Sequence, residues 1–301
     1  MSTENPFVAE PSVTTASSAA KTLRWWPAAG LLAVMGGMKL MLLVLEAPPF
    51  SVVMIAFMGP AAVSVVILLW WLFASRASVK EKIIGLSGTV CAVVIAALFM
   101  HFSMKGMSFV LYVLPTGTAL FALSLVLLAN RPTLRLPVAL IAATFGFGFW
   151  ELVQMHGVTG KFSPEFSWRW TPTAEQEYLK SLADQKSDAA TEPTTLGEII
   201  TRASAQWSDF RGPQRDSNLP GVTLAEDWKA APPKLAWKTK IGPGWSSFTV
   251  AENRLFTQEQ RGDNEAIVCL DADSGKSLWA HEYPSRFWES VAGAGPRATP
   301  T

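Results

Sequence analysis

Hydrophobic residues are concentrated in the first half of the chain, in five long runs separated by short polar breaks. A helix needs about 20 apolar residues to cross the hydrocarbon core of a membrane. The five runs have this length and cover residues 25–45, 50–74, 83–102, 109–129 and 137–155. The pattern therefore predicts a five-helix transmembrane domain over residues 25–155, preceded by a disordered cytoplasmic tail over residues 1–24.

The composition agrees with this division of the chain. Of the 301 residues, 50% are hydrophobic and 16% are charged, whereas soluble domains contain about 25% charged residues. The net charge of +1 gives no reason to expect a nucleic-acid partner. Cys91 and Cys269 fall in different halves, so we expect neither a disulfide framework nor a cysteine metal site. The lipid bilayer is the partner that the composition indicates.

Basic residues predict the orientation of the membrane domain. The tail and two of the breaks carry Lys21, Arg24, Arg76, Lys80, Lys82, Arg131 and Arg135, whereas the opposite short loops contribute only Lys105. Because basic loops stay in the cytoplasm, the amino terminus is expected inside. An odd number of spans then places everything after residue 155 outside, which in a bacterium is the periplasmic side of the inner membrane.

Two pairs of ionisable residues lie near the first and fifth predicted spans, namely Lys39 with Glu46 and Glu151 with His156. Such groups either anchor a span at the headgroup layer by extending toward water or take part in proton or quinone chemistry inside the membrane. Their places near span ends favour anchoring. Tryptophans at or near the predicted span ends suit the same layer. The glycine pairs 36–37, 85 and 88, and 146 and 148 are expected to allow close helix packing.

Residues 156–206 form a polar connector with short helices. Thr173 and Gln176 have capping-box spacing, which predicts a helix over residues 174–184, and a second helix is expected over 196–205. Residues 186–195 are flexible in composition. Trp168 and Trp170 alternate around Arg169 and are expected either to form a docking strand or to rest on the membrane surface.

From residue 207 onward the pattern changes to short alternating runs separated by Gly, Pro, Asn and Asp. Strands are expected at residues 234–241, 245–250, 254–258, 266–270 and 277–280. Strands of this length and spacing are typical of antiparallel all-β domains. The fold class is therefore multi-domain, with an α-helical transmembrane bundle followed by an all-β region.

One hairpin within this region has a distinctive sequence, running from Cys269 to Trp279. Asp271 is placed to accept hydrogen bonds from the turn, Gly275 to take a positive φ, and Trp279 to end the return strand with a large packing surface. The segment resembles the repeat of quinoprotein-type, or PQQ-like, β-propellers, whose signature is Ala-x-Asp-x-x-Thr-Gly-x-x-x-Trp. Cys269 and Ser274 replace its alanine and threonine. In that family the tryptophan docks one blade against the next.

Further segments resemble membrane-anchored PQQ-like propeller proteins, so that the likeness extends over residues 160–301. These segments are residues 166–173, 207–216, 235–238, 242–247 and 295–301. The resemblance implies that residues 207–301 begin a propeller domain. Residues 234–283 supply about one blade, whereas a propeller has four to eight. We therefore expect an incomplete propeller, belonging to an N-terminal fragment or a truncated product.

Three functions are compatible with this organisation. The first is a non-enzymatic periplasmic scaffold that binds or assembles envelope proteins. The second is a PQQ-dependent membrane dehydrogenase of the glucose dehydrogenase type, and the third is a transporter or sensor acting through the spans. PQQ and calcium are implied only by the resemblance, and no catalytic or metal-ligating residue is assigned.

His101, His156 and His281 are too dispersed in sequence to indicate a metal site. A charged cluster is expected to fasten a loop or, alternatively, to bind an anion: Asp209, Arg211, Arg215 and Asp216.

Overall fold

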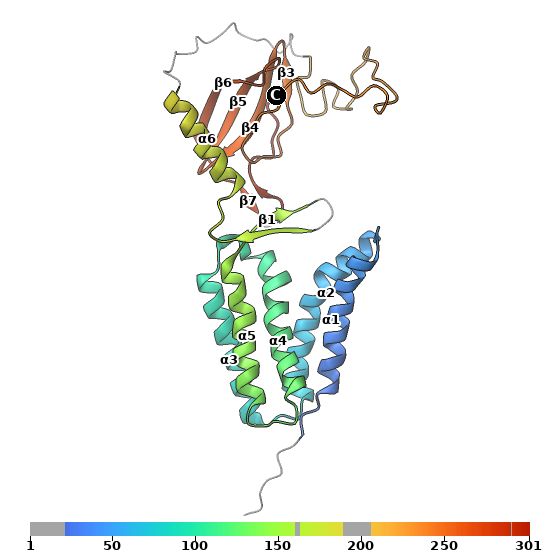
Figure 1. Ribbon diagram of the computed structural model, residues 1–301, viewed down its shortest axis with the longest axis vertical. Coiled ribbons are helices and arrows are strands. Elements are labelled where there is room, and N and C mark those ends of the chain that lie inside the picture. Colours follow the sequence, from blue (N-terminus) through green and yellow to red (C-terminus); the bar gives the residue numbers. More distant parts are fainter. Residues whose placement is uncertain (1–21, 160–162, 189–205, 290) are drawn as a thin grey trace, which may run out of the picture. The chain divides into compact units, whose positions relative to one another are not determined.

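The computed structural model describes residues 22–159, 163–188, 206–289 and 291–301. The chain divides into two compact units, each described here by itself. The helical unit runs to Leu98 and resumes over Val110–Gly148, whereas the β unit comprises Phe99–Phe109 and Phe149–Thr301 (Figure 1). Most of the predicted tail and the predicted helix at 196–205 lie outside the described residues.

Five helices of the structure are long and apolar enough to cross a membrane, which supports a multi-pass membrane protein. They are α1 (Trp26–Val44), α2 (Phe50–Leu69) continued by η1 (Trp70–Ala74), α3 (Val79–Phe99), η3 (Phe109–Val113) leading into α4 (Leu114–Leu127), and α5 (Arg135–Gly148) continued by η4 (Phe149–Leu152). The third begins four residues before its predicted start. Ser78 and Glu81 explain this because each backbone N–H bonds to the other's side chain, which caps the helix.

Close packing in the helical unit depends on only some of the predicted glycines. A Cβ on Gly146 would lie 2.9 Å from the Cα of Gly117, so α4 and α5 approach closely there. Gly85 and Gly88 also face side chains, those of Trp71 and Leu140. The prediction is wrong for Gly36, Gly37 and Gly148, which have open space around them.

Trp71 is buried, in contrast to the headgroup position expected from the sequence. Its side chain is fully inaccessible and meets the Phe121 ring edge-on at 5.5 Å. Trp70 is also buried, and its indole N–H donates to the Arg24 carbonyl. The two indoles therefore pack within the helical unit, because a bulky ring beside Gly85 gains more contact there than at the surface.

An ion pair joins the first turn of α3 to the start of α5. The Arg135 guanidinium donates to Glu81 Oε1 through Nε at 3.0 Å and Nη2 at 2.6 Å. The arginine side chain is only 4% exposed. Arg135, counted from the sequence as a basic loop residue, is thus a buried and paired residue of the helical unit.

The β unit begins where the fifth apolar run was expected to continue. Val153–Val158 forms strand β1, which pairs antiparallel with β2 (Pro164–Trp168). The prediction that the fifth span reaches residue 155 is wrong by three residues, because these residues form a ladder with β2. Trp168 ends β2, in agreement with the expected strand, whereas Trp170 lies in the turn that follows and stacks on Trp168 with ring centroids 5.4 Å apart.

A four-stranded antiparallel sheet is the largest element of the β unit. Its strands are adjacent in chain order: β3 (Thr249–Ala251), β4 (Arg254–Arg261), β5 (Asn264–Asp271) and β6 (Ser277–Pro284). Ala266, Val268 and Leu270 on β5 form its core with Phe248 and Leu255. A small pair, β7 (Trp288–Glu289) and β8 (Gly293–Ala294), lies beyond it. The sheets are open, so the described structure supports a β-sheet region and does not show a closed propeller.

The strand predicted at residues 234–241 is absent, and the one at 245–250 is reduced to β3. Alternation alone predicted these strands, but a strand also needs a neighbour that completes its hydrogen bonds. Residues 234–241 run beside the sheet without pairing, and their tryptophan takes a different role, described below.

Helix α6 (Ala174–Asp188) confirms the helix predicted from the capping box and extends four residues beyond it. Gln176 N–H donates to Thr173 Oγ1 at 3.1 Å, and Thr173 N–H donates to Gln176 Oε1 at 2.9 Å. Both partners predicted from the sequence spacing are therefore in place.

Replacing Thr173 with alanine is expected to weaken the first turn of α6 by about 1 kcal/mol, because an N-cap oxygen is lost. Hydrogen exchange of the amides at 174–178 should become several-fold faster, as measured by mass spectrometry of the full chain. Lys180→Ala, on an exposed position of the same helix, should leave these rates unchanged. Equal rates in the two variants would contradict the capping role.

Candidate functional site

The hairpin identified from the sequence is confirmed as the β5–β6 connection. Asp271 Oδ1 accepts from Ser274 N–H at 2.8 Å and from its hydroxyl at 2.6 Å. These bonds lower the pKa of the Asp271 carboxyl. Gly275 has the predicted positive φ, at +68°. Trp279 lies near the start of β6, which continues to Pro284, so the return strand is longer than predicted.

A second tryptophan, Trp237, lies against the same turn. Its Nε1–H donates to the Ala272 carbonyl at 2.8 Å. Its ring is so close to Gly275 that a Cβ there would lie 2.3 Å from indole Cε3. Gly275 is therefore required both by its φ and by the docked indole. Trp237 comes from the segment where a strand was expected, and its docking onto the turn holds that segment beside the sheet.

Trp237 and Trp279 share a short sequence pattern but differ in their surroundings. Each follows a lysine by three positions, in Lys234–Trp237 and Lys276–Trp279, and the tryptophans are 42 residues apart. The first indole is docked, whereas Trp279 is 39% exposed and contacts Phe256 at 6.0 Å between centroids. The shared spacing is therefore local, since Trp237 lies outside the strands and Trp279 lies on β6.

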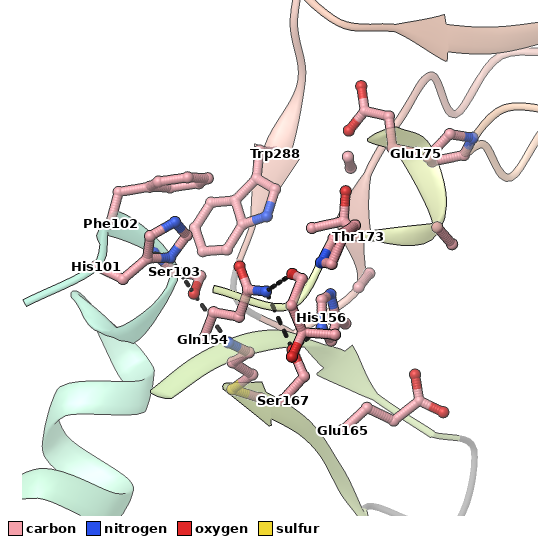
Figure 2. Close-up of a pocket in the computed structure, with 18 of the residues that line it drawn as sticks. His101, Phe102, Ser103, Gln154, His156, Glu165, Ser167, Thr173, Glu175 and Trp288 are labelled. Carbon is pink, nitrogen blue, oxygen red and sulfur yellow. Dashed lines mark hydrogen bonds between the residues drawn. The ribbon is translucent and has the colours of Figure 1, made fainter. Parts of the chain in front are cut away.

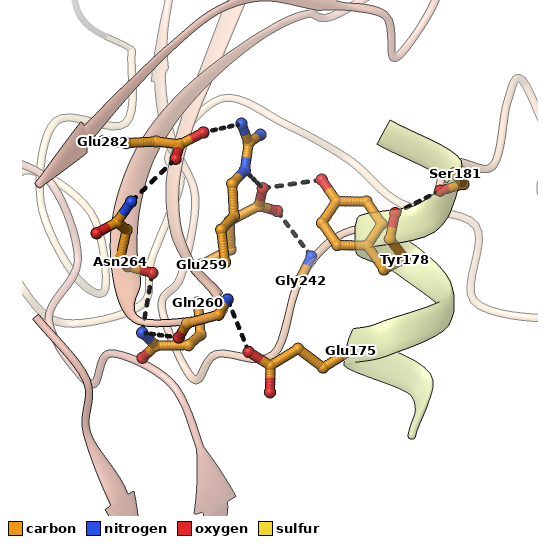
Figure 3. A network of polar contacts seen from close by, with 10 residues as sticks. Glu175, Tyr178, Ser181, Gly242, Glu259, Gln260, Asn264 and Glu282 are labelled. Atoms are coloured by element: carbon orange, nitrogen blue, oxygen red, sulfur yellow. Dashed lines mark hydrogen bonds and ion pairs between the residues drawn. The ribbon is translucent and has the colours of Figure 1, made fainter. Parts of the chain in front are cut away.

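A buried charge network joins α6 to β4 (Figure 3). Glu259 is completely buried, and Arg261 Nε donates to its Oε1 at 2.6 Å. The Tyr178 hydroxyl donates to the same oxygen at 2.8 Å, and the Gly242 N–H donates to Oε2 at 2.7 Å. Burial, followed by the nearby Glu259 carboxylate, raises the pKa of Tyr178, so its hydroxyl remains a donor. Arg261 also reaches Glu282 at 3.0 Å.

The first turn of α6 is fastened to the β4–β5 turn by a second contact. Glu175 accepts from both terminal nitrogens of Arg286, at 2.9 and 3.1 Å, and from Gly262 N–H at 2.9 Å. Arg286 also donates to the Gly262 carbonyl. Bidentate pairs of this kind fix orientation as well as distance. The two contacts together position α6 against the sheet.

A cavity of about 540 Å³ lies within the β unit (Figure 2). Its wall combines the short helix η2 (Phe102–Met104), the β1–β2 hairpin, the start of α6 and residues around β7 and β8. His101 Nδ1 lies 2.8 Å from Ser103 Oγ, and His156 Nε2 lies 2.7 Å from Ser167 Oγ. Two of the three histidines, expected to be dispersed, therefore line one cavity. The sequence did not predict this cavity, because His101 precedes α4 in the chain and His156 follows α5, so that no local pattern contains both.

The remaining sequence candidates occupy separate places. Lys39 lies on α1 with its ammonium 5.9 Å from the Tyr112 ring centroid. Glu46 follows α1 and Glu151 lies in η4, whereas His156 belongs to β1 and not to a span. Within the described residues, no group of three His, Cys, Asp or Glu side chains is arranged to hold a metal.

The charged cluster at residues 209–216 forms a tight loop. Asp209 is buried and accepts from the Ser208 hydroxyl and from Arg215. Arg211 donates to Ser217, and both residues have positive φ values. These contacts all lie between residues 208 and 217.

The two cysteines differ in their surroundings. Cys269 on β5 is completely buried, and this burial raises the pKa of its thiol. Cys91 lies on α3 with an exposed side chain.

The fold comprises five helices that are long and apolar enough to cross a membrane and an open β-sheet unit, in which Trp237 is docked on the β5–β6 turn. No protein family, curated protein or solved structure was found to match the chain.

Proposed function

We propose that the chain is a membrane-anchored, non-enzymatic scaffold whose β unit carries PQQ-like, blade-type repeats that bind other proteins on the periplasmic side of the inner membrane. The observation that supports this most is the docking of Trp237 onto the Gly275 turn. A tryptophan that seals one repeat against the next hairpin is a device for joining repeats.

The strand order of the sheet and the spacing of the two tryptophans support the same proposal. Strands β3 to β6 follow one another in space as in sequence, which is the topology of a propeller blade. The 42-residue spacing of the two tryptophans is within the range of known blade repeats, about 40–50 residues. The basic residues of the tail and of two inter-span breaks support the orientation.

The exposed Trp279 side chain is expected to make the contact between this sheet and the next repeat or a partner protein. Its equivalent, Trp237, is docked on a turn whose glycine leaves room for the indole. Trp279 then requires a second turn of the same kind, supplied by a further repeat or by another envelope protein. A single open sheet with a bare edge is otherwise an aggregation hazard.

Photo-crosslinking in cells tests this function directly. A photoreactive phenylalanine analogue at position 279 is expected to give a discrete crosslinked product whose attachment site is a β-turn peptide. Trp228, which is 56% exposed in a loop away from the sheet, is the matched control and should give none. Equal products at both positions, or none at either, would refute docking through Trp279. Dye reduction by the purified chain with quinone and calcium added would refute the non-enzymatic assignment.

A further inference from the structure

One end of the helical unit carries a group of basic side chains. The start of α1, the α2–α3 connection and the α4–α5 connection all lie at this end (Figure 1). Their exposed or half-buried basic residues, named here the basic patch, are Arg24, Arg76, Lys80, Lys82 and Arg131. Each lies in the first turn of a candidate span or within four residues of a span end. In a bilayer this is the depth of the lipid headgroups, whichever side of the membrane the end faces.

Nearby carboxylates are too few to neutralise the basic patch. Residues 50–148 contain a single acidic residue, Glu81. Its carboxylate accepts from the Arg135 guanidinium at 2.6 and 3.0 Å and from the Ser78 N–H at 2.9 Å. Residues 1–21 contribute only Glu4, Glu10 and Lys21 to the charge of the chain. The basic patch therefore keeps a net positive charge, which attracts anions.

Backbone contacts hold two members of the patch beside each other, although they are 52 positions apart in the sequence. The Arg24 N–H donates to the carbonyl of Ser75, the neighbour of Arg76, at 2.9 Å. The Trp70 indole donates to the Arg24 carbonyl at 3.1 Å, and Leu23 is buried at 4% exposure. The segment before α1 is thus fixed against the α2–α3 connection, so the two arginine backbones are preorganised as neighbours.

Arg76 occupies a backbone conformation that favours glycine. Its φ is +59°, in the left-handed region that disfavours residues with a Cβ. Ser75 and Ala77 on either side are buried, and the Ser75 hydroxyl bonds to the Trp71 carbonyl at 2.6 Å. The turn therefore buries its neighbours and leaves the arginine exposed. A strained residue that glycine could replace with less strain indicates a role for its side chain.

We propose that the basic patch binds the phosphate headgroups of anionic phospholipids, with Arg24 and Arg76 as its main contacts. Guanidinium groups match the geometry of phosphate oxygens and bind them through paired hydrogen bonds. Trp25 and Trp26, 47% and 59% exposed, place indoles at the same depth. The Arg24 guanidinium lies 5.1 Å from the centroid of the Trp26 ring. Basic side chains beside a span each strengthen the attraction to anionic lipid about fivefold.

Lipid retention by the full chain tests this proposal. The chain is released from nanodiscs of equal phosphatidylglycerol and phosphatidylcholine content, and its retained lipids are identified by native mass spectrometry. The native chain is expected to retain phosphatidylglycerol preferentially. Arg76→Gly should lower this preference about fivefold, and adding Arg24→Gln should lower it further. Because glycine suits the φ of this turn, hydrogen exchange of the α2 and α3 amides should be no faster in Arg76→Gly than in the native chain.

Two further variants separate charge at the patch from charge elsewhere. Arg76→Lys keeps the positive charge and should keep most of the preference. Lys105→Gln removes one positive charge from the connection after the other end of α3 and should leave the preference unchanged. A native chain without preference, equal losses in Arg76→Gly and Lys105→Gln, or equal losses in Arg76→Gly and Arg76→Lys would overturn the proposal. None of these results depends on docking through Trp279.

Discussion

Replacing Arg261 with methionine is expected to lower the free energy of unfolding of the β unit by about 3–5 kcal/mol, because it leaves a buried carboxylate without its counter-ion. Glu259 is completely buried, and the Arg261 side chain is 7% exposed. Tyr178 and Gly242 would still donate to the carboxylate, but neither carries a charge. Hydrogen exchange of the β4 and β5 amides in the full chain measures this loss.

Arg297→Met is the matched control for this prediction. Arg297 pairs with Glu289 at 3.1 Å. The Arg297 side chain is 34% exposed and the Glu289 side chain is 49% exposed. Exposed pairs contribute about 1 kcal/mol or less, so exchange should change little. The double variant Glu259→Gln with Arg261→Met removes the buried charge as well and should recover part of the stability. Similar losses for Arg261→Met and Arg297→Met would show that the buried pair is not important for stability.

Gly275→Ala is expected to lower the stability of the β unit by about 2–5 kcal/mol. Left-handed backbone costs a non-glycine residue about 1–2 kcal/mol, and forcing a methyl group into a filled space costs about 1–3 kcal/mol more. At this turn the methyl group would meet the Trp237 ring at 2.3 Å and displace its bond to Ala272. Chemical unfolding followed by hydrogen exchange of β5 and β6 measures the effect.

Gly221→Ala separates the two causes. Gly221 has a φ of +81° but nothing within 4 Å of a built Cβ, so only the backbone cost of about 1–2 kcal/mol applies. In a Trp237→Ala background, the cost of Gly275→Ala should fall to that of Gly221→Ala, since the clash is removed. A cost that stays the same with and without the indole would refute the docking contact as the reason for this glycine.

The sequence predicted elements that depend on nearby residues. The five apolar runs, the capping box at Thr173 and the turn from Asp271 to Gly275 are all present. Each needs only contacts within a few positions or a continuous apolar surface, and both are visible as local patterns. Span ends were less accurate, because residues 153–155 are as apolar as their neighbours but pair with β2.

Features that depend on distant partners could not be predicted in this way. Glu259, Gln260 and Arg261 appear in the sequence as a polar, solvent-exposed stretch, yet all three are buried. Glu259 accepts from Tyr178, which lies 81 positions before it, and Gln260 donates to the carbonyl of Ser285, 25 positions after it. The cavity has the same origin, since Ser103 and Met155, 52 positions apart, are joined by a hydrogen bond at its wall. No local pattern contains such pairings.

The contrast between the two cysteines has a practical consequence for labelling chemistry. Cys269 is sealed in the sheet with a raised thiol pKa, and thiolates, not thiols, react with maleimides. Cys91 lies well inside the third candidate span, where water-soluble reagents do not reach in a bilayer. The two native cysteines are therefore expected not to react with water-soluble maleimides. A single exposed cysteine introduced on the β unit would then take a fluorophore or spin label at that position alone.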